Sequence, residues 1–151
     1  MYVPGNIIYF DPFYFKDGSA SKPKYFLVIK LVGESVLLAS LPSSVDHLPR
    51  NVEIDHGCIE IPEGNINCYV FKAGRNITSN DWCFPKNTFL YGQWLDDYEI
   101  ALLNDIYPVE NIDYQIIGKL TDAELANVIG CFLNSASVKR KFKRILAQNL
   151  S

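Results

Sequence analysis

The feature that most constrains the fold is a pair of apolar runs joined by a tight turn. Residues 25–31 are almost continuously apolar, which is typical of a β-strand buried on both faces. Gly33 and Glu34 supply a tight turn, and a second apolar run follows at residues 36–41. The two runs therefore predict a β-hairpin whose first strand lies inside the protein.

Other short runs of β-branched and aromatic residues surround this hairpin. A first strand is expected over residues 6–10, stopped by Asp11 and Pro12, because proline has no N–H to donate to a neighbouring strand. Residues 96–110 fit either a short helix or a strand, and residues 62–65 read as a turn. Further strands are predicted at residues 52–54, 58–61, 66–71, 88–94 and 113–120.

The periodicity changes near residue 121. Thr121 and Glu124 form a capping box, and apolar residues then recur at helical spacing up to Leu133. A second helix is expected to turn Val138, Phe142, Ile145 and Leu146 inward and its cations outward. Short strands followed by helices predict one mainly β domain over residues 1–151, a small β-barrel with C-terminal helices from about residue 121.

Composition excludes several classes of protein. With 48% hydrophobic and 21% charged residues, the chain is not disordered as a whole, and its 151 residues suit a single domain. No apolar stretch approaches the roughly 20 residues that cross a bilayer, and residues 1–5 do not resemble a signal peptide. We therefore expect a cytoplasmic protein with no membrane partner.

The four cysteines show no metal-binding spacing. No two of them form a C-x-x-C pair, and no pair of histidines lies near them, so neither a zinc site nor another metal or cofactor is predicted. In a cytoplasmic protein, free buried thiols are the expectation for all four: Cys58, Cys68, Cys83 and Cys131.

Charge is distributed unevenly along the chain. The net charge of −3 means that binding to nucleic acid would need a local basic patch. Residues 51–120 hold eleven Asp and Glu against four Lys and Arg, whereas residues 139–144 hold five cations. The basic run suits a solvated helix face, an acidic partner or a phosphate backbone.

Four segments resemble, in order, the MazF/PemK-like toxins of bacterial toxin–antitoxin pairs. Residues 5–10 match the Gly-x-Ile start of that family, and residues 22–29 match its basic residue and proline before a long apolar strand. Residues 48–54 match Leu-Pro-x-x-Val-x-Ile, and residues 118–124 match Gly-x-Leu-Thr-Asp-x-Glu. Residues 57–110 have no counterpart in this pattern.

The resemblance implies an SH3-like barrel, usually a homodimer, that cuts single-stranded RNA without a metal and is held inactive by a cognate antitoxin. Lys22 stands where the family usually has an active-site Arg. Pro42 stands where the family usually has a Thr, with Ser43 beside it. Lysine offers a phosphate a point charge, whereas arginine offers two parallel hydrogen bonds, so these two departures bear directly on catalysis.

Cleavage by attack of the RNA 2′-hydroxyl needs a base, an acid and a cation over the phosphate. We expect Lys22, Ser43 and His47 to be catalytic, with His47 preferred to His56 as base because it lies near Ser43 in the sequence. Exposed aromatic side chains next to a polar loop suit the stacking of unpaired bases. The expected RNA-binding residues are Lys16, Lys24, Ser44, Tyr14 and Phe15.

Each of these residues also has a purely structural interpretation as a surface lysine, a turn serine or a loop histidine. The alternative function is accordingly a catalytically inactive SH3-like binding module that kept the fold. A toxin directed at a protein target would need a C-terminal helix motif that the sequence does not show.

Overall fold

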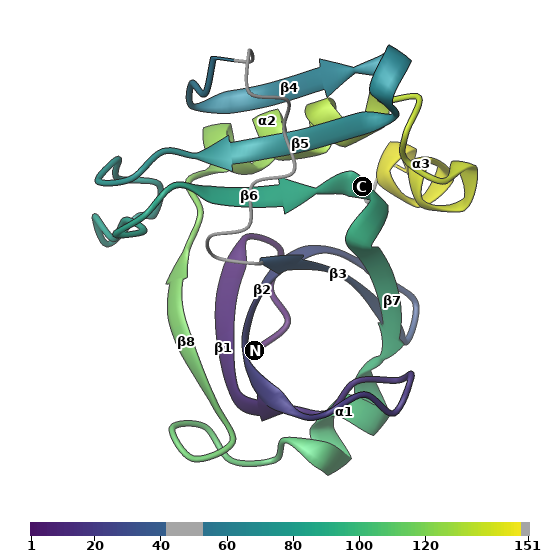
Figure 1. Cartoon of the computed structure of the whole chain (residues 1–151). Coiled ribbons are helices and arrows are strands. Elements are labelled where there is room, and N and C mark those ends of the chain that lie inside the picture. Colours follow the sequence, from purple (N-terminus) through teal and green to yellow (C-terminus); the bar gives the residue numbers. More distant parts are fainter. Residues whose placement is uncertain (42–52, 149–151) are drawn as a thin grey trace.

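The chain folds into two antiparallel β-sheets with helices packed against them (Figure 1). The computed structural model describes residues 1–41 and 53–148. The larger sheet has the order β7-β3-β2-β1-β8, with β1 at Asn6–Phe13, β2 at Lys22–Val32, β3 at Ser35–Leu41, β7 at Leu95–Glu99 and β8 at Tyr114–Lys119. The smaller sheet has the order β4-β5-β6, with β4 at Gly57–Ile61, β5 at Ile66–Phe71 and β6 at Thr88–Tyr91. The helices are α1 at Ile100–Ile106, α2 at Asp122–Leu133 and α3 at Arg140–Ala147.

The predicted hairpin is confirmed as β2 and β3, and it separates two apolar cores. Leu27 points into a core that also holds β5, α2 and α3 side chains, while its neighbours Phe26 and Val28 point into a second core that α1 closes. All three side chains are at most 2% exposed. Because both faces of β2 are covered, its apolar residues need not alternate with polar ones.

A mainly β fold with C-terminal helices is confirmed, but the sheets are not closed into a barrel. The larger sheet curves strongly, so that β1, β2, β3 and β7 wrap around the second core (Figure 1). However, β7 and β8 form the two edges of this sheet and do not pair with each other. Residues 57–91 build a separate three-stranded sheet, a layer that the family pattern did not cover.

Several element boundaries differ from the sequence prediction. The strand expected over residues 88–94 ends at Tyr91, and Gly92–Trp94 form a 3₁₀-helix. β1 does not stop before Asp11 but continues to Phe13 through a cis Asp11–Pro12 peptide bond. A register shift against β2 lies between Phe10 and Phe13, so Pro12 occupies an irregular position where no N–H is required. The ambiguous segment after residue 95 contains both alternatives, because β7 ends at Glu99 and α1 begins at the next residue. Of the strand predicted over residues 52–54, Val52 lies outside the described residues, and Glu53 and Ile54 belong to no strand, so that prediction is wrong for these two residues.

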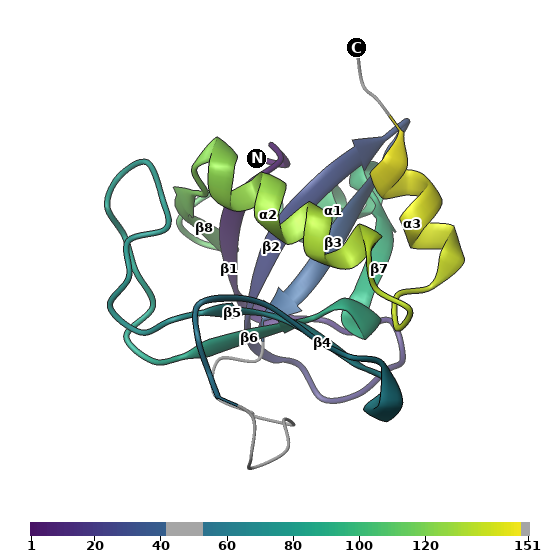
Figure 2. The ribbon, with the colours of Figure 1, turned by 90° about the horizontal axis from the view of Figure 1, so that it is seen from above.

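The start of α2 is confirmed as predicted. The Thr121 hydroxyl accepts a hydrogen bond from the backbone N–H of Glu124 at 3.2 Å. Val128 and Phe132 are fully buried, and α2 packs on β4 and β5 (Figure 2). The capping box is only half formed, however, since the Glu124 carboxylate turns to His56 rather than back to residue 121.

Helix α3 is held by contacts at both ends of its apolar face. Phe142 and Leu146 are buried as predicted. The ammonium of Lys30, itself only 8% exposed, donates to the carbonyl oxygens of Leu146 and Gln148 at the helix C-terminus. A cation at this position is favoured because the last carbonyl groups of a helix carry partial negative charge. Burial lowers the pKa of Lys30.

No helix in residues 1–41 and 53–148 has the length and apolar character that crossing a membrane requires.

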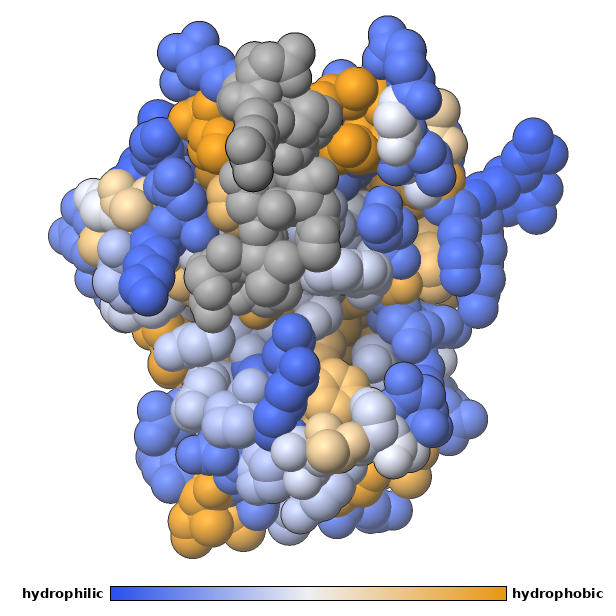
Figure 3. Space-filling model, in the orientation of Figure 1, coloured by the Kyte–Doolittle hydropathy of each residue, from blue (hydrophilic) through white to orange (hydrophobic). Residues whose placement is uncertain are grey.

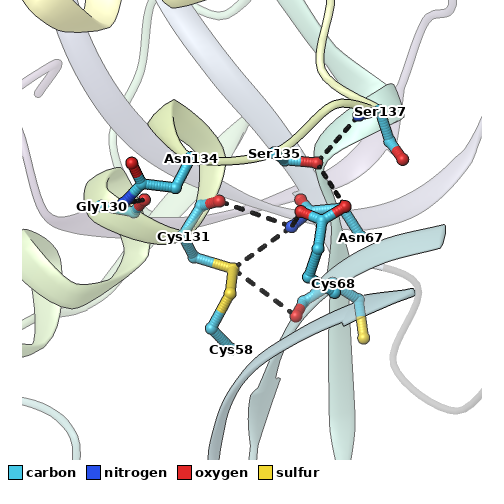
Figure 4. Close-up of a disulfide and its surroundings, with 9 residues drawn as sticks. Cys58, Asn67, Cys68, Gly130, Cys131, Asn134, Ser135 and Ser137 are labelled. Atoms are coloured by element: carbon cyan, nitrogen blue, oxygen red, sulfur yellow. Dashed lines mark hydrogen bonds between the residues drawn. A yellow bond between two sulfur atoms is a disulfide. The ribbon is translucent and has the colours of Figure 1, made fainter. Parts of the chain in front are cut away.

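The prediction of four free thiols is wrong. Cys58 of β4 and Cys131 of α2, 73 residues apart, form a disulfide (Figure 4). The packing of α2 on β4 brings their Cα atoms to 5.5 Å, a proximity that spacing along the sequence does not reveal. Disulfides are typical of oxidising compartments, so this bond does not favour the cytoplasmic location expected from the sequence.

A buried polar cluster lies beside the disulfide (Figure 4). The amide of Asn67, which is completely buried, donates to the Glu60 carboxylate at 3.2 Å and to the carbonyl of Cys131 at 3.4 Å. The buried Ser135 hydroxyl donates to the other oxygen of Glu60 at 3.1 Å. The cluster therefore ties β4 and β5 to the connection between α2 and α3. It also needs glycine at position 92, where a Cβ atom would lie 2.5 Å from the side-chain oxygen of Asn67.

Replacing Phe132 with alanine should lower the free energy of unfolding by about 3–5 kcal/mol, because the ring is fully buried between α2 and the sheets. Chemical denaturation of wild type and variant measures the difference. Leu102→Ala, at a side chain that is 55% exposed, is the control and should stay within about 0.5 kcal/mol of wild type. Equal stability of both variants would contradict this assignment of the core.

Breaking the disulfide should lower the free energy of unfolding by about 2–4 kcal/mol, because it closes a long loop in the unfolded chain. Denaturation of the Cys58→Ser/Cys131→Ser variant measures this loss. Cys83→Ser, which leaves the disulfide intact, is the control. If reduction of wild type leaves its stability unchanged, the bond does not form in the protein.

Candidate RNA-binding site

Lys22, predicted to be catalytic, and Lys24, predicted to bind RNA, lie together at the start of β2. Lys22 pairs in register with Phe13, and Lys24 pairs with Phe10. The Lys22 ammonium lies 5.7 Å from the centre of the Phe15 ring. Burial, and then the charge of Lys22, lower the pKa of Lys24. The structure thus joins a pair of cations to an aromatic ring, as a site for a stacked base and its phosphate requires.

A cleft of about 340 Å³ adjoins Phe15. Phe26 and Ser40, paired across β2 and β3, lie along it, as do Trp94 and Lys139. Lys139 directly precedes α3 and belongs to the basic run recognised in the sequence. The cleft therefore offers aromatic surface, a hydroxyl group and one further cation. Its acidic member is Asp96.

The other two residues predicted to be catalytic, and one serine predicted to bind RNA, belong to the segment after β3. Ser43, Ser44 and His47 lie outside the described residues, as does Pro42. The described part of β3 ends at Leu41, whose register partner Tyr25 is the neighbour of Lys24. Their roles stay predictions from the sequence.

Lys16 is engaged within the protein. Its ammonium lies 3.3 Å from the Asp96 carboxylate and 4.0 Å from the centre of the Tyr98 ring, and it donates to the carbonyl oxygen of Asp97. These contacts draw Lys16 toward β7, and they satisfy its charge without a phosphate.

Tyr14, Phe15 and Lys16 line one pocket of about 530 Å³. Tyr14 is 57% exposed and its ring stacks on Tyr107 with 6.3 Å between the ring centres. The backbone N–H of Tyr14 donates to the Tyr107 hydroxyl at 2.8 Å, which anchors the start of the loop. The Tyr14 ring is thus exposed on one side and packed on Tyr107 on the other, and the polar wall of this pocket includes Asp97 and Glu99. Its stacking on unpaired bases stays a prediction.

His56, the other histidine, is bound on both sides. Its Nδ1 accepts from the backbone N–H of Lys72 at 3.2 Å, and its Nε2 contacts the Glu124 carboxylate. An Nδ1 that accepts a hydrogen bond leaves the proton on Nε2, facing Glu124. With both nitrogens occupied, His56 joins α2 to the smaller sheet and offers no base to a substrate. Because the Glu124 carboxylate contacts His56, the capping box of α2 is only half formed. No pattern in the sequence predicted this contact between His56 and Glu124.

No group of three or more His, Cys, Asp or Glu side chains within the described ranges is arranged to hold a metal ion.

Comparison of the chain with protein-family models, with curated proteins and with solved structures found no match. The resemblance to MazF/PemK-like toxins therefore stays a prediction from the sequence motifs.

Buried tyrosines should make the protein unfold in alkali. Burial raises the pKa of Tyr2, Tyr69 and Tyr98 well above the ordinary value of 10.0, and the charge of Glu124 adds to the effect at Tyr69. A raised pKa in the folded state means that the stabilising contribution is complete below pH 10 and is lost as pH rises above it. The part of the tyrosinate absorbance that develops above pH 10 should change together with the circular dichroism, in one cooperative transition. Ionisation of all tyrosines near pH 10 with the fold intact would contradict the burial of these rings.

Proposed function

We propose that the chain binds single-stranded RNA and belongs functionally with the MazF/PemK-like toxins that its motifs resemble. The RNA backbone lies over Lys22 and Lys24, and unpaired bases enter the adjoining cleft between Phe15 and Trp94. A cognate antitoxin and a homodimer are part of this proposal. The observation that carries it is the meeting of the lysine pair with the aromatic cleft at one end of β2.

The arrangement suits a flexible, negatively charged strand. Lys22 is exposed, and Lys24 is half-buried beside it, so a phosphate that approaches both relieves their mutual repulsion. Base stacking on aromatic rings is worth about 1–3 kcal/mol per base and tolerates any sequence. Lys139 at the far side of the cleft gives a second contact for the backbone.

Cleavage requires more than binding. In the proposed reaction the 2′-hydroxyl attacks the neighbouring phosphate, His47 takes up its proton, Lys22 stabilises the charge on the phosphate, and Ser43 donates a hydrogen bond to it. As the bond from the 2′-oxygen to phosphorus forms, the bond from phosphorus to the 5′-oxygen breaks, which leaves a 2′,3′-cyclic phosphate, and the departing 5′-oxygen takes a proton from water.

A second function, binding without cleavage, is favoured by one observation. His56, the one histidine among the described residues, has both ring nitrogens engaged, so no imidazole base in this part of the chain accompanies the lysine pair. Such a protein would hold RNA through the same cleft and leave it intact.

Replacing Lys22 and Lys24 together with alanine should weaken binding of a labelled single-stranded RNA roughly tenfold at low salt, since two phosphate contacts are lost. The slope of log affinity against log salt should fall by about 1.4, or about 0.7 for each contact. Fluorescence anisotropy over a salt series measures both. Lys86→Ala, which removes an exposed lysine elsewhere, is the matched control.

The same RNA incubated with wild type in EDTA separates the two functions. Cleavage that persists in EDTA and disappears in His47→Ala supports the ribonuclease, and intact RNA supports the binding module. An unchanged affinity and salt slope in the double lysine variant would reject the RNA site itself.

A further inference from the structure

A second surface of the protein has the opposite character from the lysine pair. Residues 87–118 contain six acidic residues and no Lys, Arg or His. Three of the six acids, Asp96, Asp97 and Glu99, lie in β7, at one edge of the larger sheet. Apolar side chains lie exposed among them, and Figure 3 shows apolar atoms at the edge of the molecule where α1 lies. These exposed side chains are Leu102, Ile106, Val109 and Ile112.

The 530 Å³ pocket opens on this surface. Its walls are aromatic: Phe13 stacks on Tyr107 with an angle of 12° between the rings, and Tyr98 lies edge-on to Phe13. Its rim is apolar where Tyr14, Leu102 and Ile106 are exposed. A pocket of this size with a few polar groups is typical of a binding site.

The pocket already holds a cation, which is the ammonium of the chain's own Lys16. Three groups hold this ammonium, and we call them its seat: the face of Tyr98, the carbonyl oxygen of Asp97 and the carboxylate of Asp96, which lines the neighbouring smaller cleft. An aromatic face combined with oxygen acceptors is the arrangement that proteins use to bind ammonium and guanidinium groups. The other carboxylate, that of Asp97, is paired with Lys141 of α3 at 3.2 Å and is not part of the seat.

Lys16 is a replaceable occupant. Its side chain is half exposed, and it belongs to a loop in which residues 16–21 are all exposed. An exposed ion pair of this kind contributes little to stability, so an incoming cation can displace it at small cost.

From these observations we infer that the pocket docks a partner protein through a segment in which one Lys or Arg is flanked by apolar residues. The partner's cation replaces Lys16 in the seat, and its apolar side chains cover Leu102 and Ile106. The carboxylate of Glu99 in the pocket wall and that of Asp96 in the seat complement a basic segment and repel the phosphates of nucleic acid. A small free amine would fill the seat but leave the apolar rim exposed to water. This inference does not depend on RNA binding by the lysine pair.

The test uses a fluorescent peptide with one arginine between two pairs of leucines, and a second peptide with glutamine in place of arginine. Wild-type protein should bind the arginine peptide at least tenfold more tightly than the glutamine peptide. Asp96→Asn should remove most of this preference, because the seat loses its carboxylate. Lys16→Gln should tighten binding of the arginine peptide severalfold, because it removes the competing cation. Glu63→Gln, an exposed acid outside the pocket, is the control and should match wild type.

Four results would overturn the inference. They are equal binding of the two peptides, no tightening in Lys16→Gln, binding of butylamine as tight as that of the peptide, and tighter binding of single-stranded RNA than of the peptide by the Lys22→Ala/Lys24→Ala variant. A dimer that dissociates as the peptide binds, seen by size-exclusion chromatography with light scattering, would assign the pocket to a second copy of the chain and overturn it as well.

Discussion

The burial of both faces of the β2–β3 hairpin is the constraint on which the rest of the structure depends. Leu27 and Phe26 point in opposite directions and are both inaccessible to water. Each face must therefore be covered by a separate layer. The layer on one face consists of the three-stranded sheet, α2 and α3. On the other face the larger sheet curves around its own aromatic side chains, and α1 covers the end of this core.

Polar contacts decide how these layers sit against each other. Apolar packing is non-directional, so it brings α2 and α3 to the sheets without fixing their positions closely. The Asn67 cluster, the His56–Glu124 contact and the cap that Lys30 places on α3 are directional, and each joins residues far apart in the sequence. They are buried or half-buried, so losing one partner leaves the other without a hydrogen bond, at a cost of about 1–3 kcal/mol.

The two proposed binding surfaces share a wall. Phe15 and Tyr98 border both the cleft beside the lysine pair and the larger acid-rimmed pocket. The two lysines beside this wall have different surroundings. Lys16 is held by the Asp96 carboxylate and the Asp97 carbonyl group of β7, whereas Lys22 is exposed beside Phe15. A partner bound in the larger pocket would displace Lys16 next to the RNA cleft, which gives the protein a direct physical route for one ligand to affect the other.

Local patterns in the sequence determined the hairpin, the turn at Gly33, the Thr121 cap and the buried stripe of α2, because each depends on residues a few positions apart. They also located the lysine pair and its neighbouring aromatic ring, which border one short loop. The tertiary structure alone decided that the larger sheet stays open and that Cys58 forms a disulfide with Cys131. It also decided that His56 contacts the Glu124 carboxylate and that Lys16 forms an ion pair with Asp96. These outcomes depend on contacts between residues about 70 or more positions apart, which form only when the layers pack, and no local periodicity or propensity records them.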